Sequence, residues 1–281
     1  MKKIIFAVLA TTTLVFAKTL TFTAIPDQDE TQLKKRFSQF AEYLSHELDI
    51  DVKFIPVKSY AASIAAFRNN QVQLAWFGGL SGVKARLIVP GSVAIAQGVE
   101  DTIFRSYIIA NVSTGLKKSD AIPSSVAGKN FTFGSKGSTS GRLMPEYYIR
   151  KAFNKSPNDV FNKVGFSGNH SKTISLVQSG AYEVGAVNFK VWDRELAEGK
   201  IDTSKVKIIY TTPTYPDYQF TARGDLDKEY GKGFTAKLAK AIINLKDKKV
   251  LAGFPRSGFI KATNADYKPV LDVAREIGLV D

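Results

Sequence analysis

The chain alternates between two kinds of apolar pattern, and this alternation limits its fold more than any other feature. Short alternating or β-branched runs, typical of strands, occur at residues 20–25, 51–56, 72–76, 93–97, 107–110, 131–133, near 164, 184–187 and 206–210. Apolar residues at helical spacing lie between them, at residues 33–48, 59–69, 80–87, 140–153, 171–178 and 191–198. Strands that alternate with helices favour a mostly parallel sheet with helices on both faces. The sequence therefore predicts an α/β fold, closed after Tyr218 by one strand and two or three helices.

Two connections interrupt this alternation and divide the chain. Residues 111–128 are rich in Ser, Thr, Gly and Pro, and residues 211–216 read Thr-Thr-Pro-Thr-Tyr-Pro. We expect two α/β lobes: lobe one comprises residues 18–111 and 219–281, and lobe two comprises residues 112–218. Two crossings between lobes form a natural hinge, and a cleft between lobes is a common place for a small ligand.

The N-terminus has the pattern of a secretory signal peptide. Lys2 and Lys3 precede a mostly apolar run, residues 4–16, and Ala17 stands where a signal peptidase cleaves. The run is too short to cross ~30 Å of hydrocarbon as a membrane anchor. We therefore expect residues 1–17 to be removed and the mature chain to be a periplasmic protein without a lipid anchor.

The composition excludes several kinds of site. The chain has no Cys and only two His, His46 and His170, which excludes thiolate catalysis, Cys-ligated zinc, a His-rich metal site and a lipid attached to cysteine. We expect no cofactor. The formal charge of +13, from 39 basic and 26 acidic residues, favours anionic partners. The basic residues are spread along the chain without a tract that interleaves aromatic residues, so we expect no nucleic-acid partner.

One segment, residues 131–142, has a pattern that suits anion binding. A strand ends there, two glycines permit a tight turn, and Ser138, Thr139 and Ser140 open a helix. The first amides of a helix lack intrahelical partners and favour anions, and three hydroxyls add donors at the same point. The turn therefore suits a tetrahedral oxyanion; the alternative is that the three residues only cap a helix. It is not a nucleotide phosphate loop, because no Gly-Lys-Ser/Thr sequence closes it.

Polar residues at other helix starts have weaker claims. His170 stands at the start of a helix, where it could donate to an anion or only cap that helix. Tyr60 lies at the start of the second helix and Gly78 before the third, and ordinary turn chemistry is the alternative for both. His46 lies in an amphipathic helix, where we expect it to be solvated.

Several of these motifs together resemble one protein family. They are Lys58-Ser59-Tyr60-Ala61-Ala62, Ala75-Trp76-Phe77-Gly78, Ser138-Thr139-Ser140-Gly141 followed by Pro145, and Thr212-Pro213 ahead of Pro216, after an Asp-rich start. Over essentially its whole mature length, the chain resembles the phosphonate/phosphite-binding family of periplasmic solute-binding proteins that serve ABC importers. Residues 77–82, 134–137 and 212–218 look most like a subgroup described as selenate-binding proteins.

The resemblance implies a two-lobed type 2 periplasmic binding protein fold with two interlobe crossings and the ligand between the lobes. By motif, Ser138, Thr139 and Ser140 would hold the oxyanion, with Tyr60 from lobe one and His170 from lobe two. The family also implies an ABC permease in the inner membrane as the partner. We expect a monomer that captures a small oxyanion and is not an enzyme.

The sequence departs from the pattern of aminophosphonate binders, which hold the ligand's amine with a carboxylate. Counted without gaps from His170, that position falls at Lys190, which would repel an ammonium group and leave no carboxylate to pair with it. The aromatic position of that pattern near the first crossing falls at Phe104, which cannot hydrogen-bond as a tyrosine would. Asp217 is shifted by one position relative to the acidic residue of the pattern near the second crossing. We keep Gly78, Lys190 and Asp217 among the expected ligand-binding residues. The expected ligand is an oxyanion without an amine: phosphite, a simple alkylphosphonate, selenate or selenite.

Two other classes of function stay open. A ligand-sensing periplasmic subunit of a signalling system would have the same binding chemistry as an importer component. An exported enzyme on the same fold is the other alternative. Against it, the sequence offers no nucleophile-base-acid set, since His170 has no carboxylate neighbour in the sequence.

Overall fold

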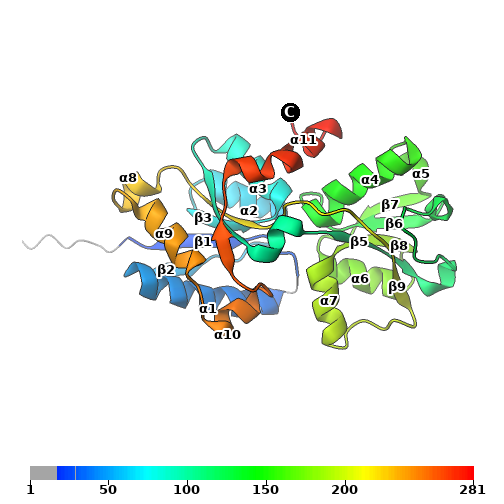
Figure 1. Cartoon of the computed structure of the whole chain (residues 1–281), viewed down its shortest axis with the longest axis horizontal. Coiled ribbons are helices and arrows are strands. Elements are labelled where there is room, and N and C mark those ends of the chain that lie inside the picture. Colours follow the sequence, from blue (N-terminus) through cyan, green and yellow to red (C-terminus); the bar gives the residue numbers. More distant parts are fainter. Residues whose placement is uncertain (1–17, 29) are drawn as a thin grey trace, which may run out of the picture.

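The computed structural model describes residues 18–28 and 30–281, which form two α/β lobes with one β-sheet each (Figure 1). The expected signal peptide, residues 1–17, lies outside the described residues. Within the described ranges, no helix has the length and apolar character needed to cross a membrane. The two-lobed α/β fold expected from the sequence is confirmed.

The sheet of lobe one has six strands in the order β11-β4-β10-β3-β1-β2. These strands are β1 (Leu20–Ala24), β2 (Val52–Phe54), β3 (Leu74–Phe77), β4 (Val93–Gly98), β10 (Gln219–Ala222) and β11 (Phe259–Lys261). β1 pairs in parallel with β2 and β3, whereas β10 runs antiparallel to both β3 and β4, and β11 runs antiparallel to β4. The helices of this lobe are α1 (Glu30–Leu48), α2 (Tyr60–Arg68), α3 (Gly79–Ile88), α8 (Leu226–Tyr230), α9 (Phe234–Ile243), α10 (Lys248–Gly253) and α11 (Lys268–Glu276).

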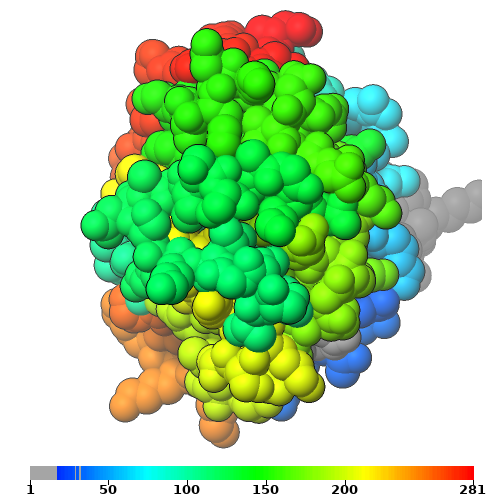
Figure 2. All heavy atoms as spheres, turned by 90° about the vertical axis from the view of Figure 1, so that its right-hand side faces the viewer, coloured from blue at the N-terminus to red at the C-terminus, as the bar shows by residue number. Residues whose placement is uncertain are grey.

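The sheet of lobe two has five strands in the order β7-β6-β8-β5-β9. These strands are β5 (Ser106–Asn111), β6 (Asn130–Phe133), β7 (Lys163–Phe166), β8 (Val184–Asn188) and β9 (Val206–Thr211). Its helices are α4 (Met144–Phe153), α5 (Pro157–Val160), α6 (His170–Gln178) and α7 (Phe189–Ala197). Single turns are η1 (Val99–Ile103), η2 (Val112–Thr114), η3 (Ser124–Val126), η4 (Thr139–Leu143) and η5 (Asn264–Tyr267). Seen end-on, lobe two forms most of the face, with C-terminal residues at its upper edge (Figure 2).

Aromatic side chains fill the core of lobe one. Phe22 on β1 packs against Phe37 and Phe40 of α1, with ring centroids 5.9 and 5.6 Å apart, and Phe40 stacks on Phe220 of β10 at 5.0 Å. All four side chains are fully buried. Burial of each ring contributes about 1.5–3 kcal/mol. The cluster fixes α1 against the sheet and thereby helps to position residues 25–28, which follow β1.

The two chain crossings pair with each other between the lobes. Phe104 and Tyr215 exchange both backbone hydrogen bonds, each 2.9 Å long. β5 follows directly and pairs in the sheet of lobe two, whereas we expected residues 106–111 in lobe one. We therefore propose to divide the lobes ahead of Ser106. An alternating pattern indicates a strand but not the sheet in which that strand pairs.

The structure also differs from the sequence prediction in strand direction and at the C-terminal end. Both sheets are mixed rather than mostly parallel, because β5 and β10 run antiparallel to their neighbours. Each of these strands enters its sheet directly from a crossing, without an intervening helix to reverse the chain. After Tyr218 the chain forms two strands and four α-helices, where one strand and two or three helices were expected.

Candidate functional site

The Ser138-Thr139-Ser140 turn follows β6 and lies between the lobes, with all three residues buried. Ser138 caps the π-helical turn η4, and its Oγ accepts a hydrogen bond from the Gly141 N–H at 2.9 Å. A side chain at position 141 would clash, because a Cβ there would lie 2.9 Å from His170 Cε1. The glycine therefore lets the backbone of the turn approach the His170 ring.

Thr139 joins this turn to lobe one. Its Oγ1 accepts a hydrogen bond from the Leu80 N–H, near the start of α3, at 2.9 Å. Beside it, Ser81 Oγ donates to the Gly137 carbonyl oxygen at 2.9 Å. A Cβ on Gly78 would lie 3.3 Å from Thr139 Oγ1, so the absence of a side chain at Gly78 allows this close approach. The structure thus brings Gly78 and the turn together across the lobe boundary.

Asp217 lies in the second crossing, beside the start of α3. Its Oδ1 accepts a hydrogen bond from the Gly79 N–H at 2.8 Å, whereas Oδ2 is buried without a partner among the described residues. Burial raises the pKa of Asp217 to about 7, although the Gly79 amide and the Thr139 and Ser140 hydroxyls act to lower it. The carboxyl group can therefore gain or lose its proton near neutral pH.

His170 is fully buried at the first position of α6. Its Nδ1 accepts a hydrogen bond from the Asn188 N–H at 3.3 Å, so the proton of the neutral ring is on Nε2. No described residue provides a partner for Nε2. Burial lowers the pKa of His170 to about 4, while Asp27 acts in the opposite direction. At neutral pH, His170 is therefore an uncharged hydrogen-bond donor.

Tyr60 is the first residue of α2, whose N-cap is Ser59. Its hydroxyl is buried and has no hydrogen-bond partner in the part of the chain that the structure describes. Burial, together with the charge of Asp27, raises the pKa of Tyr60 well above its ordinary value, although the Ser138 hydroxyl acts to lower it. Tyr60 therefore keeps its proton at neutral pH and offers a donor beside the turn.

Asp27, Tyr218 and Asn188 also lie in this region, although they were not among the site residues expected from the sequence. Asp27 Oδ2 accepts a hydrogen bond from the Tyr218 hydroxyl at 2.8 Å, and that hydroxyl accepts one from Asn188 Nδ2 at 2.9 Å. The Asp27 carbonyl oxygen also accepts the His170 N–H at 3.1 Å, across the lobe boundary. A signal was available, because Asp27 closely follows the first predicted strand, and ligands in open α/β sheets bind beyond the carboxyl ends of strands.

Four buried polar atoms in this region have no partner within the described ranges: Tyr60 OH, His170 Nε2, Asp27 Oδ1 and Asp217 Oδ2. They lie near one another, since Asp27 affects the pKa of both Tyr60 and His170, and Asp217 also affects that of Tyr60. Buried polar groups in proteins are nearly always paired, so this cluster indicates a ligand site. Two of the atoms are donors, and two are acceptors when the carboxyl groups are ionised.

Several helix starts converge on the same place. Tyr60, Gly79 and His170 are the first residues of α2, α3 and α6, and Thr139 opens η4. Helix N-termini carry a partial positive charge and favour an anion nearby. An anion in this site would therefore meet backbone dipoles and neutral donors. None of the four unpartnered atoms belongs to a cationic side chain.

Lys190 is not part of this cluster. Its Nζ lies 3.9 Å from Glu100 Oε1 of lobe one and 5.4 Å from the centre of the Phe189 ring. The structure thus places the ammonium group at a lobe contact. The expectation that Lys190 leaves the site without a carboxylate is wrong, because Asp27 and Asp217 both present an unpartnered carboxyl oxygen there.

Comparisons with known proteins show the family of the chain. A family model described as ABC transporter, phosphonate, periplasmic substrate-binding protein matches residues 22–267. The "Probable ABC transporter phosphite binding protein PhnD1" of Prochlorococcus marinus (strain MIT 9301) is 41% identical over 284 residues, 99% of this chain and 96% of that protein. The solved structure of PhnD1 from this organism in complex with methylphosphonate has a TM-score of 0.89, covering 94% of this chain and 99% of that chain.

Two more distant relatives are each 24% identical to this chain. The phosphonates-binding periplasmic protein of Escherichia coli (strain K12) is 24% identical over 213 residues, 75% of this chain and 62% of that protein. A binding protein component of an ABC phosphonate transporter from Pseudomonas aeruginosa, 24% identical, has a TM-score of 0.79 over 92% of this chain and 85% of that chain. The narrower resemblance to selenate-binding proteins stays a prediction. The chain belongs to the phosphonate-binding family of periplasmic substrate-binding proteins of ABC transporters.

Proposed function

We propose that this chain captures a small phosphorus oxyanion, such as phosphite or methylphosphonate, between its lobes and presents it to an ABC permease. The proposal rests on four buried polar atoms that have no hydrogen-bond partner among the described residues. Two of them are donors and two are carboxyl oxygens. The name of PhnD1 as a phosphite-binding protein, and its structure with methylphosphonate, support this ligand class.

The donors of the site are suited to the charged oxygens of the ligand. Tyr60 OH and His170 Nε2–H would each bind an anionic oxygen, and a hydrogen bond to a charged group contributes about 1.5–3 kcal/mol. The starts of α2, α3 and α6 add their partial positive charge. Because His170 is neutral at pH 7, it adds no full positive charge to this half of the site.

The two carboxyl groups set the protonation state of the ligand. An ionised carboxylate only accepts hydrogen bonds, so Asp27 and Asp217 would repel a bare anionic oxygen and bind a ligand O–H. Phosphite and methylphosphonate resemble phosphate monoesters, whose second pKa is about 6, and part of their population therefore keeps a proton near neutral pH. Sulfate and selenate are fully ionised there. We infer that the bound species is a singly protonated phosphorus oxyanion, which disfavours selenate.

Calorimetric titration with phosphite, methylphosphonate, sulfate and selenate at pH 6, 7 and 8 tests this proposal. We expect the two phosphorus oxyanions to bind at least about 100-fold more tightly than sulfate or selenate, which corresponds to ~2.7 kcal/mol. Their affinity should fall toward pH 8, as the ligand loses the proton that the carboxylates accept. Selenate binding as tight as that of phosphite would contradict the proposal.

The proposal makes the chain a monomeric binding protein of the periplasm that leaves its ligand chemically unchanged. Membership of an ABC transporter family supports the importer role over a sensor subunit or an exported enzyme. Phosphorus NMR after long incubation should show only the starting methylphosphonate, and a new phosphorus compound would favour the enzyme alternative. N-terminal sequencing of the exported protein should find Lys18 as the first residue.

A further inference from the structure

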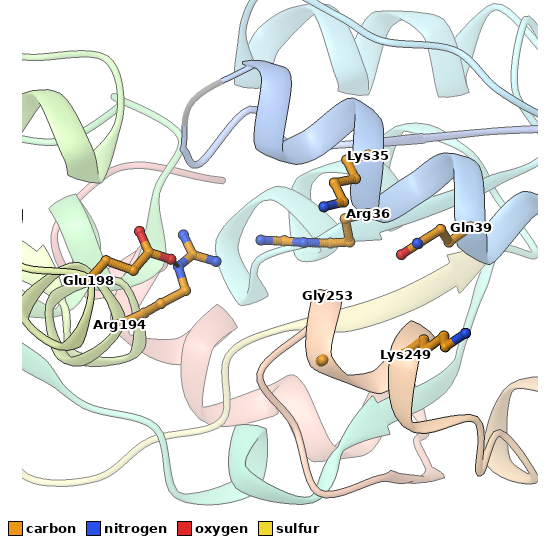
Figure 3. Close-up of a pocket in the computed structure, with 8 residues that line it drawn as sticks. Lys35, Arg36, Gln39, Arg194, Glu198, Lys249 and Gly253 are labelled. Atoms are coloured by element: carbon orange, nitrogen blue, oxygen red, sulfur yellow. Dashed lines mark ion pairs between the residues drawn. The ribbon is translucent and has the colours of Figure 1, made fainter.

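Apart from the ligand site, a pocket lies at the lobe boundary, next to α1, α7 and α10 (Figure 3). Its volume is about 360 Å³. Its lining includes four basic side chains, Lys35, Arg36, Arg194 and Lys249, and one acidic side chain, Glu198. α1 and α10 belong to lobe one and α7 belongs to lobe two, so both lobes contribute positive charge to one space.

Arg36 carries a buried charge that forms no ion pair with any described residue. The residue is 5% exposed; its Nη2 donates to Gln28 Oε1 at 3.0 Å, and its Nε has no partner. Burial lowers the pKa of Arg36 to about 10; Asp27 acts to raise it, and the nearby charge of Arg194 acts to lower it. The guanidinium therefore stays charged at neutral pH, and a buried charge without an anionic partner is costly.

Arg194 brings a second guanidinium group from lobe two to the same acceptor. It also donates to Gln28 Oε1, so one neutral amide oxygen serves two cations from opposite lobes. Figure 3 shows the side chains of Arg36 and Arg194 extending toward each other. Glu198 Oε1 lies 3.6 Å from Arg194 Nε, but Glu198 Oε2 is also paired with Lys200 Nζ at 2.6 Å. The positive charge of the pocket thus exceeds its negative charge.

We propose that this pocket is a second anion-binding site, in which a small free oxyanion bridges Arg36 and Arg194. Guanidinium groups bind oxyanions through parallel N–H donors, and Arg36 Nε is such a donor without an acceptor. Lys35 and Lys249, which form no ion pair in the described part of the chain, add positive charge around the pocket. The unpartnered buried donor distinguishes this pocket from an ordinary basic surface.

Because the pocket spans both lobes, its occupation is coupled to their closure. Arg194 reaches Gln28 only when lobe two lies against lobe one, and Gln28 adjoins Asp27 of the ligand site. An anion that bridges the lobes favours the closed form and so strengthens ligand capture, and the ligand strengthens anion binding by the same factor. The coupling rests on the proposed function, whereas the anion site itself does not.

Sulfate is the probe for this site, because it has no proton to offer Asp27 or Asp217 and is expected to avoid the ligand site. We expect saturable sulfate binding to the ligand-free full chain in calorimetry at constant ionic strength, weakened about tenfold by Arg194→Gln. Lys249→Gln should weaken it less. Lys248→Gln is the matched control: Lys248 is the exposed neighbour outside the pocket lining, and its loss should leave sulfate binding unchanged.

The coupling is measured as the methylphosphonate affinity with and without sulfate. We expect sulfate to raise that affinity about fivefold in the wild type and in Lys248→Gln, and to leave it unchanged in Arg194→Gln. Equal sulfate binding in the wild type and Arg194→Gln, or no saturable sulfate binding in the wild type, would overturn the site. Sulfate binding without an effect on methylphosphonate would overturn the coupling.

Two further results separate this inference from the proposed function. If Thr139→Ala abolishes sulfate binding and Arg194→Gln does not, sulfate binds in the ligand site. That result would overturn both the second site and the proposed selection of a protonated ligand. A wild type that binds sulfate in the Arg194-dependent way but binds no phosphorus oxyanion would contradict the proposed function alone. Circular dichroism of each variant checks that the fold is kept.

Discussion

His170 Nδ1 accepts a hydrogen bond from the Asn188 backbone N–H, and this contact decides which proton faces the ligand site. The neutral ring must then carry its proton on Nε2, the atom without a partner among the described residues. In a catalytic triad, by contrast, a carboxylate holds the histidine and stabilises its charged form. A backbone amide does not stabilise an imidazolium, so the geometry is that of a fixed donor for an anion.

The first prediction concerns stability in acid. Burial lowers the pKa of His170 from 6.5 to about 4, so between these values the unfolded chain binds a proton that the folded chain does not. The stability contributed by neutral His170 is therefore present above pH 6.5 and is lost as the pH falls toward 4, by about 3 kcal/mol in all. Chemical denaturation of the ligand-free protein at pH 7 and pH 4 measures this loss. His170→Gln should lose less stability, and equal losses would mean that other groups dominate.

The second prediction concerns Thr139, whose hydroxyl accepts the Leu80 N–H across the lobe boundary. Thr139→Ala should weaken methylphosphonate binding by about 1.5–3 kcal/mol, because it removes a hydroxyl of the oxyanion turn and leaves a buried amide unpaired in the closed form. The melting temperature without ligand should change little. Thr139→Ser keeps the hydroxyl and is the matched control. Unchanged affinity in Thr139→Ala would reduce the turn to a helix cap.

The third prediction concerns ligand protonation and Asp217. Asp217→Asn replaces an acceptor with a group that can donate, so phosphite should bind roughly tenfold more weakly and sulfate more tightly than in the wild type. Calorimetry with both anions, in the Arg194→Gln background so that sulfate binding at the second site is weakened, gives the ratio of their affinities. A ratio equal to that of the wild type would show that Asp217 does not select the protonated ligand.

The raised pKa of Asp217 also predicts that the free energy of unfolding changes with pH in the absence of ligand. Burial raises its pKa from 3.8 to about 7, so the stability linked to this group is complete below pH 3.8 and declines as the pH rises through 7. Asp217→Asn cannot ionise, and its stability relative to the wild type should therefore increase from pH 6 to pH 8. Denaturant unfolding at both pH values measures this difference, and a constant difference would contradict the prediction.

The last prediction concerns closure. Contacts across the boundary include Leu80 with Thr139, Ser81 with Gly137 and Asp27 with His170, and the crossings pair with each other at Phe104 and Tyr215. Rotation of intact lobes about these crossings would break the first group of contacts and keep the pairing of the crossings. X-ray scattering should give a smaller radius of gyration with methylphosphonate than without it. Identical radii would mean that ligand binding does not depend on lobe closure.

The sequence by itself determined most strands and helices, because periodicity is a local property of the chain. The strand expected at residues 20–25 is β1 (Leu20–Ala24), and the helix expected at residues 59–69 is α2, with Ser59 as its N-cap. The turn at Ser138 was recognisable for the same reason, since glycines, hydroxyls and a helix start are adjacent in the chain. The resemblance to the phosphonate-binding family rested on such local motifs.

Only the tertiary structure decided which strand joined which sheet and which side chains became buried together. The sequence pattern did not show that β5 pairs in the five-stranded sheet, because pairing depends on distant strands. Asp27 meets His170 only where the lobes touch, and Lys190 faces Glu100 of the other lobe instead of the ligand site. The pKa of Asp217 is raised because elements from both lobes exclude water from it, and burial by distant parts of the chain leaves no local pattern in the sequence.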